Sequence, residues 1–368
     1  MEYSADDATA YQTIRVTAPE SPVAALADVE AWKARKTYPS MLFAGGPVFG
    51  VAREGQAGGW VLQPYFSGLA PQDARDGLGS YFRRIASEAA GGGDRRQAAE
   101  YQAAGELLDW EALNDLTVCG CRYRVVRAER FIRMGPDGPE PPRITDPDPS
   151  RPGESHEGLD PAAGLLIDPY DATGVSEGIL KAELLAALRK HGTVPGGVRD
   201  DSQTAAVTHP GGVLLPATFM TAEREGGQWR PGSSGTATTP QSARDGLAMQ
   251  LRVMVPWQRD LTNEQRSVYN GAADRLDAQR CDELDVAGRH FRIVRVERLL
   301  RVGPDGPEGP RPSDPDPVPP VMVQDRELRE QGLLRDEEDG PEEPDESTQK
   351  FLRLFDEERR RREALRRA

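Results

Sequence analysis

The chain has 368 residues, 37% of them hydrophobic, and a formal net charge of −14 from 60 acidic and 46 basic residues. Glycine and proline make up about 19% of it, below the range of low-complexity sequences, so we expect a folded core. No run approaches roughly 18 apolar residues, no leader-like segment opens the sequence, and three cysteines make no disulfide framework. We therefore expect a cytoplasmic protein without membrane contact, whose acidity disfavours nucleic acid outside a local basic segment.

The first half of the chain predicts a helix, a hairpin and two further helices. Ser21 fits the N-cap and Pro22 the first position of the opening helix. Apolar segments punctuated by glycine predict a hairpin within residues 40–66. Apolar side chains at helical spacing then predict helices over residues 78–89 and 101–108.

The second half predicts the same order of elements. Its first helix is expected to open at Ser176 and to carry residues 189–191 in its last turn. Thr239 is the expected N-cap of the next helix, which we expect Pro256 to stop. A capping box from Thr262 to Gln265 predicts the third helix.

An internal repeat explains this parallel. Residues 119–149 and 287–317 lie 168 positions apart and are identical at 19 of 31 positions, and QDARDGL at 72–78 returns as QSARDGL at 241–247. β-Branched residues at 293–296 predict that each unit ends in a long strand. The expected fold class is α+β, with two tandem homologous units, each a small, mostly antiparallel sheet with helices packed on one side, plus a C-terminal helical tail.

Composition predicts five segments. They are a first α+β repeat at 1–149, a linker rich in Pro, Gly and Asp at 150–174, a second repeat at 175–320, an acidic disordered spacer at 321–349, and a basic amphipathic helix at 350–368.

Each long strand carries an Arg-Glu-Arg pattern on one face. The six residues are Arg127, Glu129 and Arg133, and Arg295, Glu297 and Arg301. Such a row is typical of a solvated sheet face with cross-strand ion pairs. The alternatives are recognition of an anionic ligand and acid–base chemistry by Glu129 and Glu297.

A turn and an acidic, proline-spaced segment follow each strand. The acidic residues are Asp146, Asp148, Asp314 and Asp316. Because a residue before proline avoids the helical region, we expect an extended arm that crosses its own unit. The alternative is a carboxylate- or metal-dependent hydrolase built on Asp137, Glu140, Asp146, Asp148 and their second-copy equivalents.

The tail helix carries a run of arginines. They are Arg359, Arg360, Arg361 and Arg362. A helix of this kind docks on a partner or on nucleic acid, or folds back on the acidic body.

The repeated ERFIRMGPDGPEPPRITDPDP segment and its upstream ARDGL helix resemble an uncharacterised family of internally duplicated proteins from high-GC Gram-positive bacteria. The resemblance covers most of residues 20–320 and implies no activity and no catalytic residue. The sequence also shows no phosphate-binding loop and no nucleophile with a positioned base. We therefore predict a non-catalytic intracellular binding or adaptor protein that engages another protein through its repeats or tail, with no cofactor and no metal.

Overall fold

The computed structural model describes residues 13–55, 58–64, 66–154, 161–190, 192–232, 235–259, 261–333 and 344–367. No helix within these ranges is long and apolar enough to cross a bilayer. Of the predicted acidic spacer, residues 334–343 lie outside the described ranges, whereas its first ten residues form helix α10 (Val321–Glu330).

The first half contains the predicted helices and long strand. Its helices are α2 (Pro22–Thr37), α3 (Pro71–Gly91) and α4 (Arg95–Trp110). Its strands, with the short strand of the linker, are β1 (Ser40–Phe43), β2 (Val48–Glu54), β3 (Trp60–Leu62), β4 (Asp115–Val118), β5 (Cys121–Gly135), β6 (Gly138–Pro139) and β7 (Leu166–Ile167). The predicted N-cap is confirmed, because the Ser21 hydroxyl accepts a hydrogen bond from the N–H of Ala24 at 3.1 Å.

The second half contains its predicted helices and long strand, with three further helical segments between them. Its helices are α5 (Val175–Ala186), α6 (Gly196–Thr208), α7 (Pro240–Met249), the π-helix η1 (Gln250–Met254), α8 (Val255–Gln258) and α9 (Asn263–Gln279). Its strands are β8 (Gly211–Glu225), β9 (Gln228–Pro231), β10 (Glu283–Val286), β11 (Arg289–Gly303) and β12 (Gly306–Pro307). The predicted capping box at Thr262 and Gln265 is confirmed, and helix α11 (Glu346–Arg367) closes the described chain.

Two predicted helix ends are wrong. The first helix of the second half ends at Ala186, so Arg189 leaves the helix, and its guanidinium reaches Glu129. The prediction for His191 lies outside the described residues. Pro256 does not stop its helix, because the preceding turn widens into η1 and the helix continues to Gln258. The wide π-turn accommodates a proline that has no N–H to donate.

All strands of the described chain belong to one curled antiparallel sheet. Its main order is β7-β3-β2-β5-β11-β8-β9. The two long strands β5 and β11 pair at its centre, where Arg130 lies opposite Arg298. These residues are themselves 168 positions apart, so corresponding residues flank one point on both strands. The two halves thus share a continuous sheet instead of forming separate small sheets.

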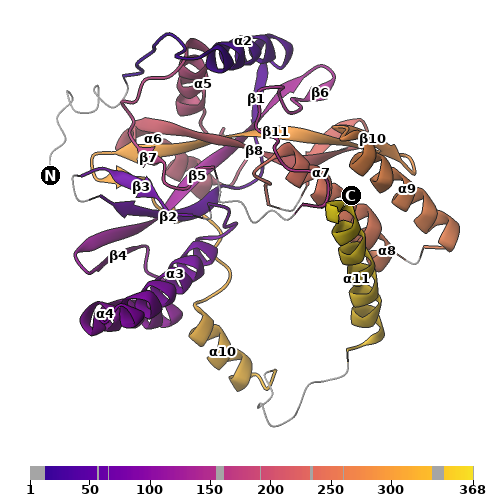
Figure 1. The fold of residues 1–368 in the computed structure, drawn as a ribbon. Helices are drawn as coiled ribbons and strands as arrows, with labels where there is room; N and C mark the ends of the chain where they lie inside the picture. The colour runs from indigo at the N-terminus through magenta and orange to yellow at the C-terminus, as the bar shows by residue number, and fades with distance from the viewer. Residues whose placement is uncertain are drawn as a thin grey trace.

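Helices cover the two ends of this sheet (Figure 1). At one end α3 and α4 pack on β2, β4 and β5, around Phe49, Phe82 and Tyr123. At the other end α7, η1 and α9 pack on β8, β10 and β11, around Phe219 and Phe291. Each end therefore has its own core of helices on one sheet face.

Candidate functional site

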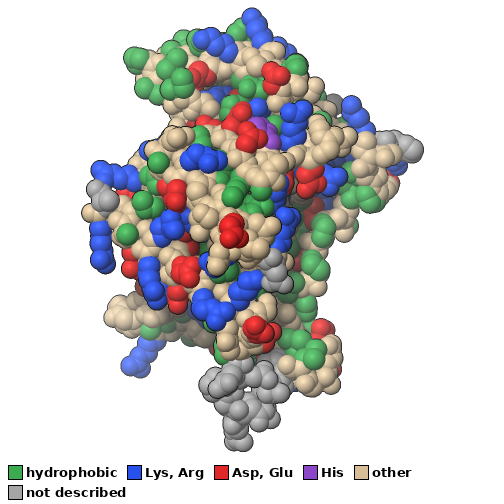
Figure 2. Space-filling model, turned by 90° about the vertical axis from the view of Figure 1, so that its right-hand side faces the viewer, with side chains coloured by type: hydrophobic (Ala, Val, Ile, Leu, Met, Phe, Trp, Pro, Cys, Tyr) green, Lys and Arg blue, Asp and Glu red, His purple; other side chains and the backbone are tan. Residues whose placement is uncertain are grey.

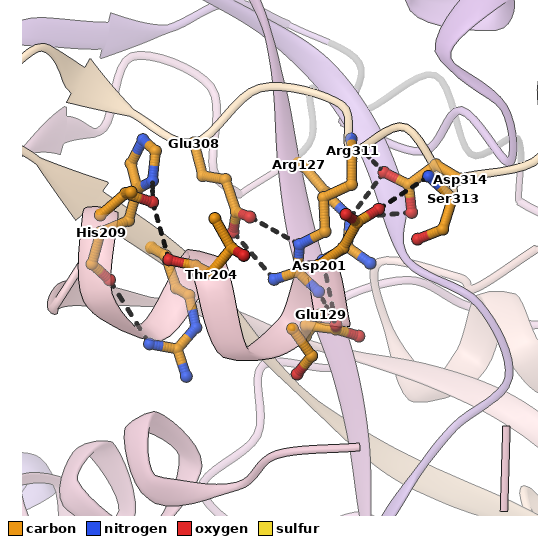
Figure 3. Close-up of polar contacts among 12 residues, drawn as sticks. Arg127, Glu129, Asp201, Thr204, His209, Glu308, Arg311, Ser313 and Asp314 are labelled. Atoms are coloured by element: carbon orange, nitrogen blue, oxygen red, sulfur yellow. Dashed lines mark hydrogen bonds and ion pairs between the residues drawn. The ribbon is translucent and has the colours of Figure 1, made fainter. Parts of the chain in front are cut away.

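The repeated Arg-Glu-Arg segment lies inside the molecule. On β5, Glu129 is buried and accepts hydrogen bonds from Arg127 at 3.0 Å, Arg311 at 3.0 Å and Arg189 at 3.1 Å. Figure 3 shows Arg127 and Arg311 converging on this carboxylate. Arg127 also pairs with Asp314 at 2.8 Å. The expectation of a solvated sheet face is therefore wrong, because these charges neutralise one another within the protein.

Glu129 is held in its charged form. Burial by itself raises the pKa of a carboxyl group, but Arg127, Arg189 and Arg311 outweigh it and lower the pKa of Glu129 to about 2. A group with this pKa is a poor proton acceptor near neutral pH. The arrangement therefore suits a structural role better than acid–base chemistry.

A corresponding cluster surrounds Glu297 on β11. Glu297 accepts from Arg295 and, at 3.4 Å, from Arg143. Arg295 also pairs with Asp146 at 3.0 Å, and Arg143 with Glu140 at 2.6 Å. Burial raises the pKa of Glu140 although Arg143 opposes the shift. Among the described residues two arginines contact Glu297, whereas three contact Glu129.

The outer arginines of the two strands hold helix α5. Arg133 pairs with Glu183 at 2.9 Å, and Arg301 donates to the carbonyl of Leu185 at 2.6 Å. Both arginines are buried. They therefore contribute to packing and present no free cationic surface.

The acidic arms cross to the other half of the chain. Asp146, from the first half, binds Arg295 on β11, and Asp314, from the second half, binds Arg127 on β5. The expectation that each arm crosses its own unit is therefore wrong. The arms are exchanged, because the buried arginines of each long strand need carboxylates and the opposite arm supplies them.

The second aspartate of each arm binds the start of a helix. Asp316 accepts from the N–H of Gln72 at 3.0 Å and pairs with Arg75 at 2.7 Å, both on α3. Asp148 does the same on α7, with Gln241 at 2.8 Å and Arg244 at 2.7 Å. A carboxylate is favourable there because the N-terminus of a helix carries partial positive charge. No metal-binding group of acids, histidines and cysteines occurs within the described ranges.

The tail helix α11 folds back on the second half. Arg362 pairs with Glu358 at 3.0 Å, and Arg361 pairs with Asp274 of α9 at 2.6 Å. Arg359 pairs within the helix with Asp356 at 2.9 Å, and Arg360 is exposed. On the face shown in Figure 2, basic and acidic side chains are interspersed. The predicted arginine cluster is thus divided among contacts with the body, contacts within the helix and solvent.

A pocket of about 620 Å³ lies between β8 and helix α7, and we call it the α7 pocket. Its lining includes Phe219, Thr221, Ala237, Ala243 and Gly246. It continues over three methionine and two glutamine side chains: Met220, Met249, Met254, Gln250 and Gln258. Thioethers adapt to irregular apolar groups, and amides supply hydrogen bonds at fixed points.

A second pocket, of about 550 Å³, lies at the corresponding place in the first half, and we call it the α3 pocket. Its lining includes Phe49, Val51, Gly68, Ala74 and Gly77, which lie 169 or 170 positions before the residues named first for the α7 pocket. The adjoining loops are also held alike. Phe49 and Gly68 exchange two main-chain hydrogen bonds, as do Phe219 and Ala237. A pocket between a strand, a loop and a helix therefore occurs at corresponding places in both halves.

A helical glycine lies on the wall of each pocket. A Cβ added at Gly77 or Gly246 would meet no atom within 4 Å, so each position opens into free space. Glycine inside a helix is less stable than alanine by roughly 0.5–1 kcal/mol. Packing does not require glycine at either position. The absence of a side chain there leaves the wall of each pocket open.

The carboxylates that line the two pockets are already bound. Glu223 of the α7 pocket pairs with Arg289 at 2.6 Å. Asp73 of the α3 pocket accepts the N–H groups of Leu69 and Ala70 at 2.7 and 3.1 Å. The α3 pocket also includes the guanidinium of Arg84, which pairs with Glu88 at 2.5 Å. The pockets otherwise offer apolar surface with hydroxyl and amide groups, which is a composition for binding.

The sequence interpretation missed both pockets. The signal that could have found them is the glycine of the repeated ARDGL segment, which lies inside both α3 and α7. The predicted arginines and aspartates lie elsewhere, in the centre of the sheet, along the exchanged arms and on α11.

The fold and the pockets define an α+β protein with one curled antiparallel sheet and a pocket in each half. Over residues 21–317 the chain matches DUF5954, a family of unknown function, and it belongs to that family. No curated protein and no solved structure shows a significant match.

Proposed function

We propose that this chain is a non-catalytic intracellular binding protein, built from two homologous units, that engages another protein through the α3 and α7 pockets. The observation that carries the proposal is the repetition of one pocket, with its helical glycine, in both halves. Each pocket has the volume of a site for an aromatic or long apolar anchor. Two sites on one continuous sheet favour a partner that presents two such anchors, because the second contact is then intramolecular.

The state of the ionisable groups supports binding over hydrolysis. Of the carboxylates a hydrolase would use, Glu140, Asp146 and Asp148 each pair with an arginine, and Asp305, the equivalent of Asp137, pairs with Arg122 and Arg124. The intracellular part of the proposal rests on the three cysteines, which are all free thiols.

Filling the pockets tests this proposal. We expect Gly77→Leu to abolish binding at the α3 pocket and Gly246→Leu to abolish binding at the α7 pocket, because each side chain would grow into open space. A phage-displayed peptide library selected against the full chain supplies the probe, and calorimetry counts the bound peptides. Two sites per chain should fall to one in each single variant.

The matched control is Gly271→Leu in α9, since an added Cβ there also meets no atom within 4 Å and Gly271 lines neither pocket. Peptides that bind the two pocket variants and the control equally well would refute the proposal. Failure to select any peptide would count against it as well.

The same glycines predict a gain in stability. We expect Gly77→Ala and Gly246→Ala each to raise the free energy of unfolding by about 0.5–1 kcal/mol, because alanine restricts the unfolded chain and meets no obstacle in the helix. Urea denaturation of the two variants measures the change. A loss of stability in either variant would show that the space at that glycine is not open.

A further inference from the structure

We infer that the tail helix α11 forms part of the support of the α7 pocket and thereby raises its affinity, while the α3 pocket is independent of the tail. The effect on affinity rests on the proposed function, because it needs a ligand that binds the α7 pocket. The structural support of the pocket wall by α11 can be measured without a ligand. The two pockets would then differ in affinity control, because in the described part of the chain α11 packs behind one of them and not behind the other.

The wall of the α7 pocket extends further along its helix than that of the α3 pocket. Gln250 and Met254 from η1, and Gln258 from α8, line the α7 pocket. The residues that correspond to Met254 and Gln258 are Ile85 and Ala89, and neither lines the α3 pocket. The extra wall therefore consists of Met254, at the end of the π-turn, and Gln258 in the segment after it. π-Turns are frequent at functional sites.

Helix α11 packs directly on this extra wall. It contacts η1 and α8, and the rings of Phe351 and Trp257 meet edge to face with centroids 5.3 Å apart. The indole N–H of Trp257 also donates to the hydroxyl of Ser347 at 3.1 Å. Arg252 of η1 pairs with Glu358 of α11 at 3.3 Å, and both side chains are buried. The π-turn is thus held from behind by the tail while its other side faces the pocket.

The first half shows the same site without a tail. Arg83 of α3 pairs with Asp109 at 3.0 Å, just as the corresponding Arg252 pairs with Asp277 at 2.6 Å. The side chain of Arg83 is 40% exposed, whereas that of Arg252 is 4% exposed beneath Glu358. There α3 remains a regular α-helix through the corresponding residues. The π-turn occurs in the half that has Pro256, where α3 has Ser87, and that also has the docked α11.

The contact that docks α11 is incompletely satisfied. Within the described structure, Nε of Arg252 and Oε2 of Glu358 are buried without a hydrogen-bond partner. A buried ion pair that leaves such atoms unpaired gains little net stability, so this pair adds little to the docking of α11. By linkage, a ligand that favours the tail-supported wall also favours the docked tail.

Displacing the tail tests the inference without a ligand. Two double variants of the full chain are compared. One carries Glu358→Ala and Leu354→Ala, and the other carries Phe351→Ala and Leu354→Ala. All three residues lie on α11 and outside the pocket lining. Hydrogen exchange across residues 346–367 reports release of the helix. Exchange across 250–258, together with the ¹³C-methyl signals of Met249 and Met254, reports the pocket wall. Residues 81–89 and the methyl signals of Met41 and Met134 serve as internal controls.

We expect release of α11 to speed exchange across 250–258 by about tenfold or more and to shift the Met249 and Met254 signals, with the controls unchanged. A selected peptide should then bind the α7 pocket about tenfold more weakly and the α3 pocket with unchanged affinity. A released tail with an unchanged wall would overturn the inference. If no peptide binds, the proposed function fails, but the exchange and methyl signals still decide whether α11 supports the wall.

Discussion

Glu129→Gln is expected to destabilise the protein by about 3–5 kcal/mol, because it leaves buried arginines without their shared carboxylate. Arg127, Arg189 and Arg311 all donate to Glu129, and none of these side chains is more than 13% exposed. Glutamine has the same shape but no charge, so the loss reports electrostatics instead of a cavity. Guanidinium chloride denaturation at pH 7 measures it.

The loss should depend on pH. The pKa of Glu129 is about 2 in the folded protein and 4.5 ordinarily, so its contribution is complete above pH 4.5 and disappears as the pH falls through 2. Its size is about 3 kcal/mol. The difference in stability between the wild type and Glu129→Gln should therefore be constant from pH 7 to 5 and shrink steadily towards pH 2.

Two variants make the comparison specific. Glu297→Gln removes the corresponding carboxylate, which is contacted by two arginines, and we expect a smaller loss than for Glu129→Gln. Glu88→Gln removes the exposed partner of Arg84 and should change stability by less than about 1 kcal/mol. A loss at Glu129 no larger than that at Glu88 would contradict a buried network.

Local signals in the sequence predicted much of the secondary structure. Helix caps at Ser21 and Thr262 and the long strand at 293–296 depend on neighbouring residues, and the structure confirms them. The sequence also shows the alternating charged residues of the long strands. This pattern does not distinguish a solvated sheet face from a buried ion-pair network. What decides between them is the pairing of β5 with β11 and the crossing of the arms, which join residues far apart in the chain.

The pockets depend on the same distant contacts. The sequence placed Gly77 and Gly246 in helices, yet a glycine faces open space only in relation to a strand and a loop from elsewhere in the chain. The π-turn was not predicted, because Pro256 by local rule ends a helix, whereas here the preceding turn widens and the helix continues. It occurs where α11, about 100 residues later, packs on the helix.

The turns after the two long strands form a reciprocal lock between the halves. The turn at Gly306, from the second half, lies against Trp60 of β3, and the turn at Gly138, from the first half, lies against Trp229 of β9. Arginines complete each contact. Arg124 donates to the carbonyl of Pro307 at 3.2 Å, and Arg292 donates to the carbonyl of Pro139 at 2.9 Å.

Gly138→Ala should therefore cost about 2–5 kcal/mol, and Gly306→Ala a similar amount. Both glycines have positive φ, +120° and +108°, which an L-residue adopts at a cost. A Cβ at either would also collide with the indole of the opposing tryptophan. Urea denaturation measures the loss. Because the variants weaken this contact without separating the halves, calorimetry should still show one unfolding transition.

Gly120→Ala separates the two causes of this loss. Gly120 has φ of +73°, but a Cβ there meets no atom within 4 Å, so the variant carries the backbone cost alone. Adding Trp229→Ala to Gly138→Ala removes the collision with the indole, and the double variant should lose less stability than the sum of the single losses. Strictly additive losses, or a loss at Gly138 equal to that at Gly120, would mean that the turn and the indole do not interlock. The halves would then be held together by the central strands and the exchanged arms.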